Sequence, residues 1–486
     1  SLLIIIVIAT PGAATRADES VDPDALAASL RRFAGSVIEK ARDRYGPKHT
    51  PLFVCQLDLD SNSLPPPDSK LYRTDTRGGA GPTMNNLQFD TALIRFLDAM
   101  TQVTGNPAYA AAVDEYLAYY LEHLPEPRTG LFPWGDHRGY DVVTDTTVGG
   151  PHEFKCTRPP WERLYAARPQ AVTRAIRSLR LHIYDETRSL AFSRHFLSGK
   201  SIPHSMNSSG FAWVAAWAFL ARTTGEDEYA VWAREMVDYS AALRNPNTHL
   251  LAAHPYDPAD PATLKNPISA LRASRTEYMG QITFLSANLL HAADLASDPT
   301  GDYFRSETLT YIHAITDRMD VQPDGSFYAT FDLESGKPLF PRITDAWSYV
   351  SQTNETHTWS NSVLGIRAPA IMAFAYLKTG DPTLLATFEQ LMPLWRLEEF
   401  ADPTAVRKPL PAGLMAQAIV AFLNIHEATG RAEYLAHAGT FATYAAKHYV
   451  TDDGWVVCGP SNLNRYNDPN LKTWRMYSNR GGSDDL

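Results

Sequence analysis

Three short segments carry residue types that could bind a metal ion and act on a substrate beside it. They are Trp134-Gly135-Asp136-His137-Arg138, His152-Glu153-Phe154-Lys155 and Arg194-His195. One carboxylate and two imidazoles, from Glu153, His137 and His195, form a ligand set suited to divalent manganese, cobalt, nickel or zinc. We therefore predict a metal site at these three residues, with Arg194 beside the bound cation.

The residues around Glu153 leave two other readings open. Single histidines in helical proteins usually fill core or surface positions, and the chain has 15. His152, which adjoins Glu153, is the alternative histidine ligand. The pattern His152-Glu153-x-x-Cys156 lacks the second histidine of a zinc-protease helix, so Cys156 is predicted to be a buried thiol.

The composition is that of a folded acidic protein of 486 residues, with 44% hydrophobic and 20% charged residues. The net charge of −10 argues against nucleic acid as a partner, because phosphate binding needs a clustered basic surface. An acidic polysaccharide or oligouronide remains a possible substrate, since a local arginine cluster binds carboxylates even on an acidic protein.

The N-terminal residues resemble the end of an export signal. The apolar run from Ser1 to Ala9 is too short to span a membrane, and Thr15-Arg16-Ala17 is a small-x-Ala cleavage pattern. We predict that residues 1–20 are a signal-peptide remnant and that the protein is exported, to the periplasm or the medium. The three cysteines, Cys55, Cys156 and Cys458, allow at most one internal disulfide.

A repeated turn organises the rest of the chain. It reads Thr104-Gly105-Asn106-Pro107, Thr224-Gly225-Glu226-Asp227, Thr379-Gly380-Asp381-Pro382 and Thr429-Gly430-Arg431-Ala432, with a looser copy at Pro299-Thr300-Gly301-Asp302. The glycine is suited to closing one helix in a left-handed conformation, and the residue behind it is suited to starting the next. Each copy therefore predicts a helix, a tight turn and a second helix.

The helix before each turn is the more apolar one. Gly210 to Leu220 is apolar on nearly every face and so is predicted to be buried. The helix after that turn carries a polar stripe of Arg234, Glu235 and Asp238. This alternation indicates inner and outer helices of an all-α fold, an (α/α) barrel of six or seven helical hairpins with short strands only in loops.

The hairpins are expected near residues 86–124, 159–185, 208–243, 276–319, 360–397 and 412–449, with a further helix near 24–45. We see no linker, so residues 21–486 are predicted to be one catalytic domain with a peripheral C-terminal tail.

The three segments named first resemble the motifs of the family two polysaccharide lyases, which are metal-dependent pectate lyases with an (α/α) barrel. The resemblance matches Gly135-x-His137-Arg138, His152-Glu153-x-Lys155 and Arg194-His195 residue by residue. It implies that His137, Glu153 and His195 bind the metal, manganese above all, and that Arg194 is the catalytic base. The first two segments lie closer together than in the family pattern, so the preferred uronide is left open.

Such lyases cleave the glycosidic bond by β-elimination, which starts by removing the proton at C5 of a uronic acid. That proton is weakly acidic until the C6 carboxylate is neutralised, which is the task of a divalent cation. Arginine side chains are ordinarily protonated, with a pKa above about 12, and act as bases only where positive neighbours lower that value. A carboxylate clamp is therefore the alternative role for Arg194.

A second set of residues is predicted to contact substrate. Arg272, Arg275 and Tyr278 open one inner helix, and Trp359 opens another. An arginine there could bind a uronate and an aromatic ring could cover a sugar face. Ordinary helix capping and packing explain the same residues equally well.

Two other functions stay open at this point. An (α/α)-barrel glycoside hydrolase acting on uronic or unsaturated oligosaccharides would need two carboxylates at the scissile bond. Asp136, Asp141, Glu153 and Glu277 are candidates, but no pair is distinguished by the sequence. A protein that binds oligouronides without cleaving them is the third possibility.

Overall fold

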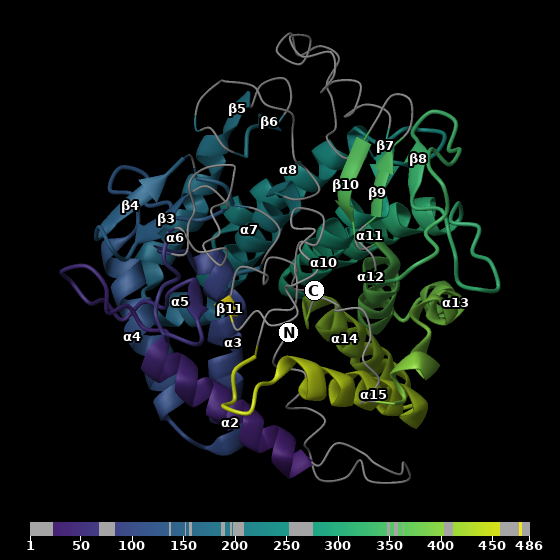
Figure 1. The fold of residues 1–486 in the computed structure, drawn as a ribbon. Coiled ribbons are helices and arrows are strands. Elements are labelled where there is room, and N and C mark those ends of the chain that lie inside the picture. Colours follow the sequence, from purple (N-terminus) through teal and green to yellow (C-terminus); the bar gives the residue numbers. More distant parts are fainter. Residues whose placement is uncertain are drawn as a thin grey trace. The chain divides into compact units, whose positions relative to one another are not determined.

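The computed structural model is mostly helical (Figure 1). It describes residues 23–67, 83–135, 138–150, 152–154, 158–185, 190–194, 197, 209–251, 276–347, 350–353, 358–362, 364–402, 412–456 and 476–478. The predicted signal-peptide remnant, residues 1–20, lies outside them. Residue contacts divide the chain into two compact units, which are described separately. A single domain over residues 21–486 stays a prediction.

The first unit holds the first and the last of the helices that the structure describes. Its helices are α2 (Pro23–Lys40), α3 (Leu87–Thr104), α4 (Ala108–His123), α5 (Trp161–Ala167), α14 (Ala412–Thr429) and α15 (Ala432–Tyr449), with the 3₁₀ helix η5 (Leu397–Phe400). Helix α3 packs on α4, and α14 packs on α15. The ring of Phe33 in α2 lies 5.4 Å from the ring of Phe96 in α3 and 6.1 Å from that of Trp455, between centroids. These aromatic contacts join α2 both to α3 and to the segment that follows α15.

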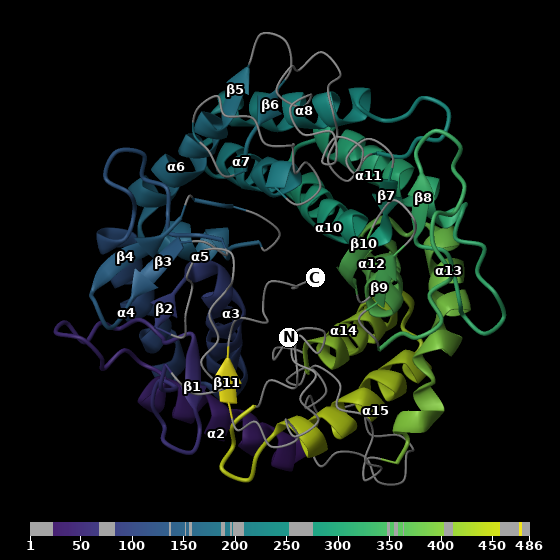
Figure 2. The same ribbon diagram turned by 45° about the horizontal axis from the view of Figure 1, so that its top comes forward.

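The second unit is built from three consecutive hairpins. They are α7 (Phe211–Thr224) with α8 (Asp227–Ala242), α10 (Met279–Leu295) with α11 (Thr300–Thr316), and α12 (Leu364–Thr379) with α13 (Pro382–Leu391). Helices α7 and α12 both pack on α10, while α8 packs on α11, so this unit has two layers (Figure 2). Every residue from Phe211 to Leu220 is buried, and Arg234 pairs with Asp238 at the surface of α8. The predicted apolar and polar helices are both confirmed.

The predicted hairpins are all present, and the all-α fold class is confirmed. The less regular pair is α5 with α6 (Pro169–Ser178), and the boundary between the two units falls within α6. The 3₁₀ helices η1 (Leu179–His182) and η4 (Met392–Trp395) follow α6 and α13. No described helix is long and apolar enough to cross a membrane.

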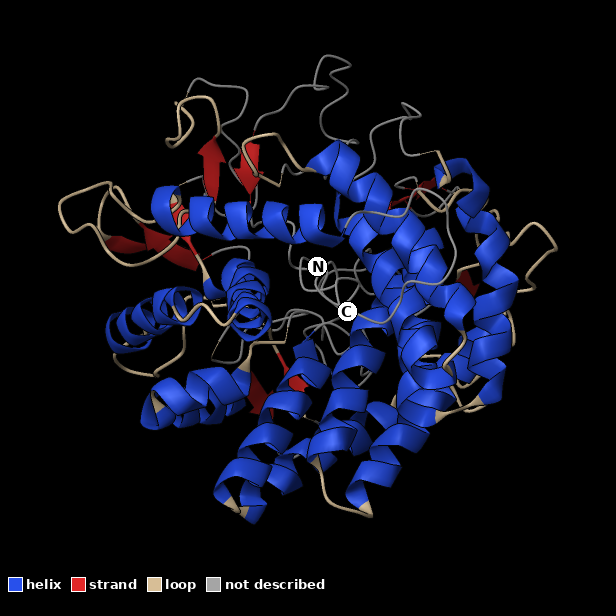
Figure 3. Cartoon of the chain, turned by 90° about the horizontal axis from the view of Figure 1, so that it is seen from below, coloured by secondary structure: helices blue, strands red, loops and turns tan. Residues whose placement is uncertain are grey.

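Strands are short and lie between helices, as the sequence predicts (Figure 3). They are β1 (Gln56–Asp58), β2 (Met84–Asn85), β3 (Arg138–Asp141), β4 (Thr146–Gly149), β5 (Ile183–Asp185), β6 (Ala191–Phe192), β7 (Thr276–Tyr278), β8 (Thr330–Asp332), β9 (Val350–Thr353), β10 (Thr358–Ser362) and β11 (Met476–Ser478). Among them, β2, β3 and β4 form a three-stranded antiparallel sheet; the other sheets have two strands.

The repeated turn has the predicted glycine conformation in four of its five copies. Gly105 has φ +69° and Gly225 φ +74°, and Gly380 and Gly430 are similar. The threonine before each glycine has a role that the sequence did not reveal. Its hydroxyl donates to the carbonyl four residues earlier and accepts the N–H two residues later, as Thr224 does with Leu220 and Glu226. The same atom thus satisfies the end of one helix and the turn into the next.

The looser copy at Pro299-Thr300-Gly301 departs from this pattern. Gly301 does not close α10; it lies inside the first turn of α11. A Cβ atom at this position would stand 2.8 Å from the carbonyl oxygen of Ala293. Glycine is required here for close contact between α10 and α11, and the expectation of a left-handed turn at this copy is wrong.

Candidate functional site

The segment Trp134–Arg138 lies beside the first turn of α3. Strand β2 pairs with β3, and β2 runs directly into α3 through Asn86 (Figure 2). Strand β3 begins at Arg138, the last residue of the segment. The sheet therefore brings the segment to the start of a buried helix of the first unit. Asp136 and His137 lie outside the described residues.

Glu153 packs directly against this segment. Its backbone N–H donates to the carbonyl of Trp134 at 3.2 Å. Gly135 has φ +93°, and a Cβ atom there would stand 2.4 Å from the carbonyl oxygen and 2.6 Å from Cβ of Glu153. Glycine is therefore needed at position 135 both for its backbone conformation and for the contact. Two of the three segments singled out in the sequence thus meet in the structure.

The Glu153 side chain is fully buried, with 0% exposure, and its neighbour His152 is 7% exposed. Buried carboxylates in proteins are paired with cations or hydrogen-bond donors. A carboxylate in such a place suits a divalent cation chemically. Among the described residues, however, no group of three or more His, Cys, Asp or Glu side chains is arranged to hold a metal ion. His195, like His137, lies outside them, so the full ligand set stays a prediction.

A network of buried hydrogen bonds surrounds the start of α3. The Asn85 amide donates to the carbonyl of Phe53 at 2.8 Å and to the Asp90 carboxylate. The Tyr116 hydroxyl donates to the same carboxylate at 2.7 Å. Burial and the charge of Asp90 raise the pKa of Tyr116 well above its ordinary value, so the phenol stays a donor. Sequence reasoning missed this network, because Phe53 and Tyr116 are far from Asn85 and Asp90 along the chain.

Asn86, the N-cap of α3, ties this network to the candidate site. Its side-chain oxygen accepts the N–H of Gln88 at 2.8 Å. Its side-chain nitrogen donates to the carbonyl of Gly135 at 2.7 Å and to that of Arg138 at 2.6 Å. One carboxamide therefore holds the backbone on both sides of residues 136–137.

Arg194 belongs to the second unit, where it follows the hairpin of β5 and β6. The residue before it, Ser193, makes two hydrogen bonds with His182. The Ser193 N–H donates to the carbonyl of His182 at 3.0 Å, and the carbonyl of Ser193 lies 2.7 Å from Nδ1 of His182. Because a carbonyl only accepts, Nδ1 of His182 carries the proton. Arg194 itself is half-buried.

Trp213 of α7 contacts both this hairpin and Phe154, the residue that follows Glu153 in the chain. Its indole N–H donates to the carbonyl of Phe154 at 3.2 Å. Its ring lies 5.2 Å from the imidazole of His182 and 4.7 Å from the ring of Phe192, between centroids. All of these residues belong to the second unit. One buried side chain thus fixes the segment that follows Glu153 and the segment that precedes Arg194.

The predicted substrate residues are placed only in part. Arg272 and Arg275 lie outside the described residues. Tyr278 ends strand β7, opposite Thr330, and Trp359 lies in β10, opposite Gln352. At Tyr278 and Trp359, the expectation of a helix start is wrong. They pair as strands, which satisfies their backbone groups before the helices begin.

The chain matches a known family over part of its length. Residues 70–257 match the model of the family described as periplasmic pectate lyase. This confirms the predicted resemblance and supports a polysaccharide-processing enzyme. All three motif segments lie within the matched residues, whereas the second set, Arg272, Arg275, Tyr278 and Trp359, lies beyond them.

Several solved structures are similar to the chain. One is cellobiose 2-epimerase from Bacillus thermoamylovorans, at 12% identity over 78% of this chain and 88% of that chain, with a TM-score of 0.44. Another is an inactive variant of α-1,6-mannanase from Salegentibacter, at 9% identity over 94% and 96% of the chains, with a TM-score of 0.42. A third is a polysaccharide lyase, at 9% identity over 94% and 51%, with a TM-score of 0.40. Similarity at this level carries no information on substrate.

Proposed function

We propose that this relative of the periplasmic pectate lyases is a metal-dependent polysaccharide lyase that cleaves uronic-acid polymers, such as pectate, by β-elimination. The observation that carries the proposal is the contact of Gly135 and Trp134 with Glu153. Two segments chosen for their chemistry alone meet there through a contact that only glycine allows. The carboxylate beside that contact is buried.

The metal in this proposal is bound by His137, Glu153 and His195. A divalent cation bound there would neutralise the uronate carboxylate and so make the C5 proton of the substrate more acidic. Manganese is the first choice; cobalt, nickel and zinc suit the same imidazole and carboxylate ligands.

In this proposal Arg194 takes the C5 proton of the substrate. The electron pair of the C5–H bond forms the C4–C5 double bond, and the bond from C4 to the glycosidic oxygen breaks. The leaving oxygen takes a proton from solvent, so the products are an unsaturated uronide and a new chain end. His182 and Trp213 support this role, because they fix the backbone immediately before Arg194.

Export to the periplasm or the medium is part of the proposal. It rests on the apolar run from Ser1 to Ala9 and the cleavage pattern ending at Ala17, and on the periplasmic description of the matched family. Sequencing the N-terminus of the protein recovered outside the cytoplasm tests it, and a start at or shortly after Ala17 is expected.

The function is tested by incubating the purified protein with polygalacturonate and other acidic polysaccharides, with and without a chelator. The 4,5-unsaturated product absorbs in the ultraviolet, and reducing ends are counted in the same samples. We expect absorbance and reducing ends to rise together, and both to stop when the metal is removed.

The two alternatives give different results. Reducing ends without ultraviolet absorbance would identify a glycoside hydrolase. Binding of oligouronides with neither signal would identify a non-catalytic protein. Either result on the preferred substrate would overturn the proposal.

A further inference from the structure

Asn86 makes more contacts than a helix cap requires. An N-cap needs one acceptor, and Oδ1 of Asn86 supplies it to the N–H of Gln88. The two hydrogens of Nδ2 are used elsewhere, on the carbonyls of Gly135 and Arg138. The side chain is 1% exposed, so water does not substitute for these bonds.

Asparagine and aspartate cap helices about equally well, so capping alone does not call for an amide here. A carboxylate has no hydrogen to donate and would face two carbonyl oxygens. Asn106, at the start of α4, shows the simpler case. Its Oδ1 accepts the N–H of Ala108 at an exposed position.

The Asn86 bonds extend to Glu153 through Gly135. The carbonyl of Gly135 is held by Asn86, and the Cα of Gly135 is packed against the backbone of Glu153. The neighbouring Trp134 carbonyl accepts the N–H of Glu153. Releasing the Gly135 carbonyl would therefore loosen the backbone that positions the Glu153 carboxylate.

We propose that Asn86 is a positioning residue for the metal centre, because its amide fixes the backbone on both sides of His137 and holds Gly135 against Glu153. The proposal rests on the proposed function, in which His137 and Glu153 bind the cation. Asn86 itself touches neither cation nor substrate. Its effect is to hold the ligands in place before the cation arrives, which lowers the cost of binding.

The test compares Asn86→Ser and Asn86→Asp with the unchanged protein. Both substitutions keep an oxygen that caps α3, and both remove the two donated bonds. Affinity for Mn²⁺ is measured by competition with a chromophoric chelator, at a temperature where circular dichroism shows every variant folded. We expect affinity to fall about 10- to 100-fold in both, as for other residues that orient metal ligands.

Asn106→Ser is the matched control, since it removes an asparagine at a helix start that has no bond to the site. Its Mn²⁺ affinity should be unchanged. A second readout is turnover, which should recover in Asn86→Ser when Mn²⁺ is raised to saturation, because the chemical groups are all present. A purely structural role for Asn86 would lower the melting temperature and leave the affinity unchanged.

The two proposals fail in different ways. If the unchanged protein binds no divalent cation, the proposed function is wrong and Asn86 has no centre to position. If it binds Mn²⁺ and either folded Asn86 variant binds equally tightly, only the role of Asn86 is overturned. Asn86→Asp keeps the size of the side chain, so it provides the measurement if Asn86→Ser does not fold.

Discussion

At the scale of single residues, Arg194 separates catalysis from binding. If Arg194 is the base, Arg194→Lys should lower kcat about a hundredfold or more, the usual contribution of a positioned proton acceptor. Lysine keeps the positive charge for the uronate but moves the group that takes the proton. KM should change little. Steady-state kinetics on polygalacturonate at saturating Mn²⁺ measure both constants.

The opposite pattern would assign a clamp. A clamp binds substrate equally in the ground and transition states, so its loss raises KM and leaves kcat largely intact. That result would show that Arg194 binds the substrate and takes no part in the proton transfer.

Trp213 offers a second prediction with a matched partner in the same helix. Trp213 and Trp217 are both fully buried, and each donates its indole N–H to a main-chain carbonyl, of Phe154 and Ile176 respectively. Replacing either by phenylalanine should cost about 1–3 kcal/mol, because a buried carbonyl loses its donor. Denaturant unfolding measures this.

Only Trp213→Phe should also lower kcat/KM, by about tenfold or more. The carbonyl that accepts the Trp213 N–H belongs to Phe154, the residue after Glu153, and the Trp213 ring packs on His182. Equal activity in Trp213→Phe and Trp217→Phe would show that Trp213 serves packing alone.

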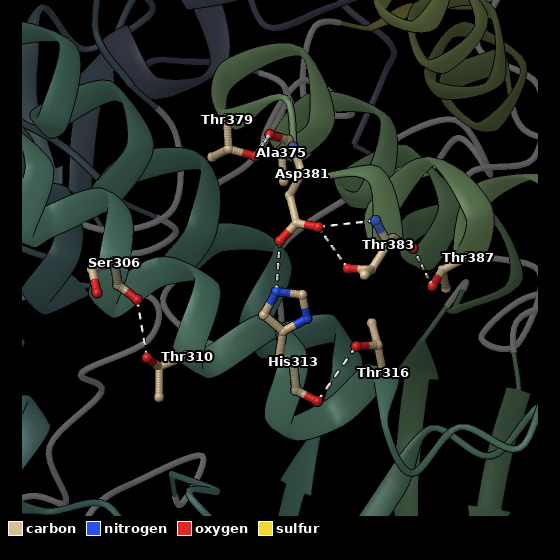
Figure 4. Close-up of polar contacts among 9 residues, drawn as sticks. All are labelled: Ser306, Thr310, His313, Thr316, Ala375, Thr379, Asp381, Thr383 and Thr387. Atoms are coloured by element: carbon tan, nitrogen blue, oxygen red, sulfur yellow. Dashed lines mark hydrogen bonds and ion pairs between the residues drawn. The ribbon is translucent and has the colours of Figure 1, made fainter.

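At the scale of elements, His313 and Asp381 join the end of α11 to the start of α13 (Figure 4). Nε2 of His313 lies 2.8 Å from Oδ2 of Asp381, whose other oxygen caps α13 by accepting the Thr383 N–H at 2.9 Å. Burial opposes ionisation of Asp381, but the bonds from Thr383 and His313 prevail and lower its pKa below the ordinary value. Ionised Asp381 therefore stabilises the fold.

Asp381→Asn keeps the cap and removes the charge. A carboxyl whose pKa is lowered on folding stabilises above its unfolded pKa, and the effect is lost as pH falls through the folded value. We expect a loss of about 0.5–1 kcal/mol at neutral pH, small because the pair is partly exposed. The difference from the unchanged protein should close below about pH 4. Urea unfolding across that range measures it.

Asp302→Asn is the control, since Asp302 lies in the first turn of α11 and pairs with Arg305 at the surface. It should cost less than about 0.5 kcal/mol at neutral pH. A constant difference for Asp381→Asn down to pH 2 would show that its charge plays no part.

The helices were predictable because the repeated turn has a local cause. Gly105 and its counterparts adopt a conformation that other residues avoid, so their positions mark helix ends in the sequence. Gly301 shows the limit of this reasoning. Glycine is needed at position 301 because Ala293 of the neighbouring helix comes close, and local sequence does not encode that contact.

At the scale of the whole molecule, a bound metal should contribute to stability. A ligand present at a hundred times its dissociation constant stabilises the folded state by about 2.7 kcal/mol. Adding a chelator to the metal-loaded protein should therefore lower the melting temperature, and excess Mn²⁺ should restore it. Calorimetry measures the change. A melting temperature indifferent to both additions would contradict a metal centre held by this chain.

The sequence predicted those parts of the candidate site that depend on side-chain chemistry. It did not predict the parts that depend on hydrogen bonds to the backbone. Glu153 and Gly135 were found from the types and order of residues in their segments. Asn86, His182 and Trp213 were missed, because each acts on a main-chain carbonyl that any residue would present. The pairing of β7 with β8 and of β10 with β9 was missed for the same reason, because strand pairing uses backbone groups.

These bonds to main-chain carbonyls have a consequence for how the sequence is free to change. The donors Asn86, His182 and Trp213 are each tied to one chemical type, whereas the acceptors at Arg138, Ser193 and Phe154 contribute only their backbone to those bonds. An amino-acid substitution at an acceptor position leaves the hydrogen bond intact as long as the new side chain fits. We therefore expect substitutions to be tolerated better at the acceptor positions than at the three donors, which are all buried.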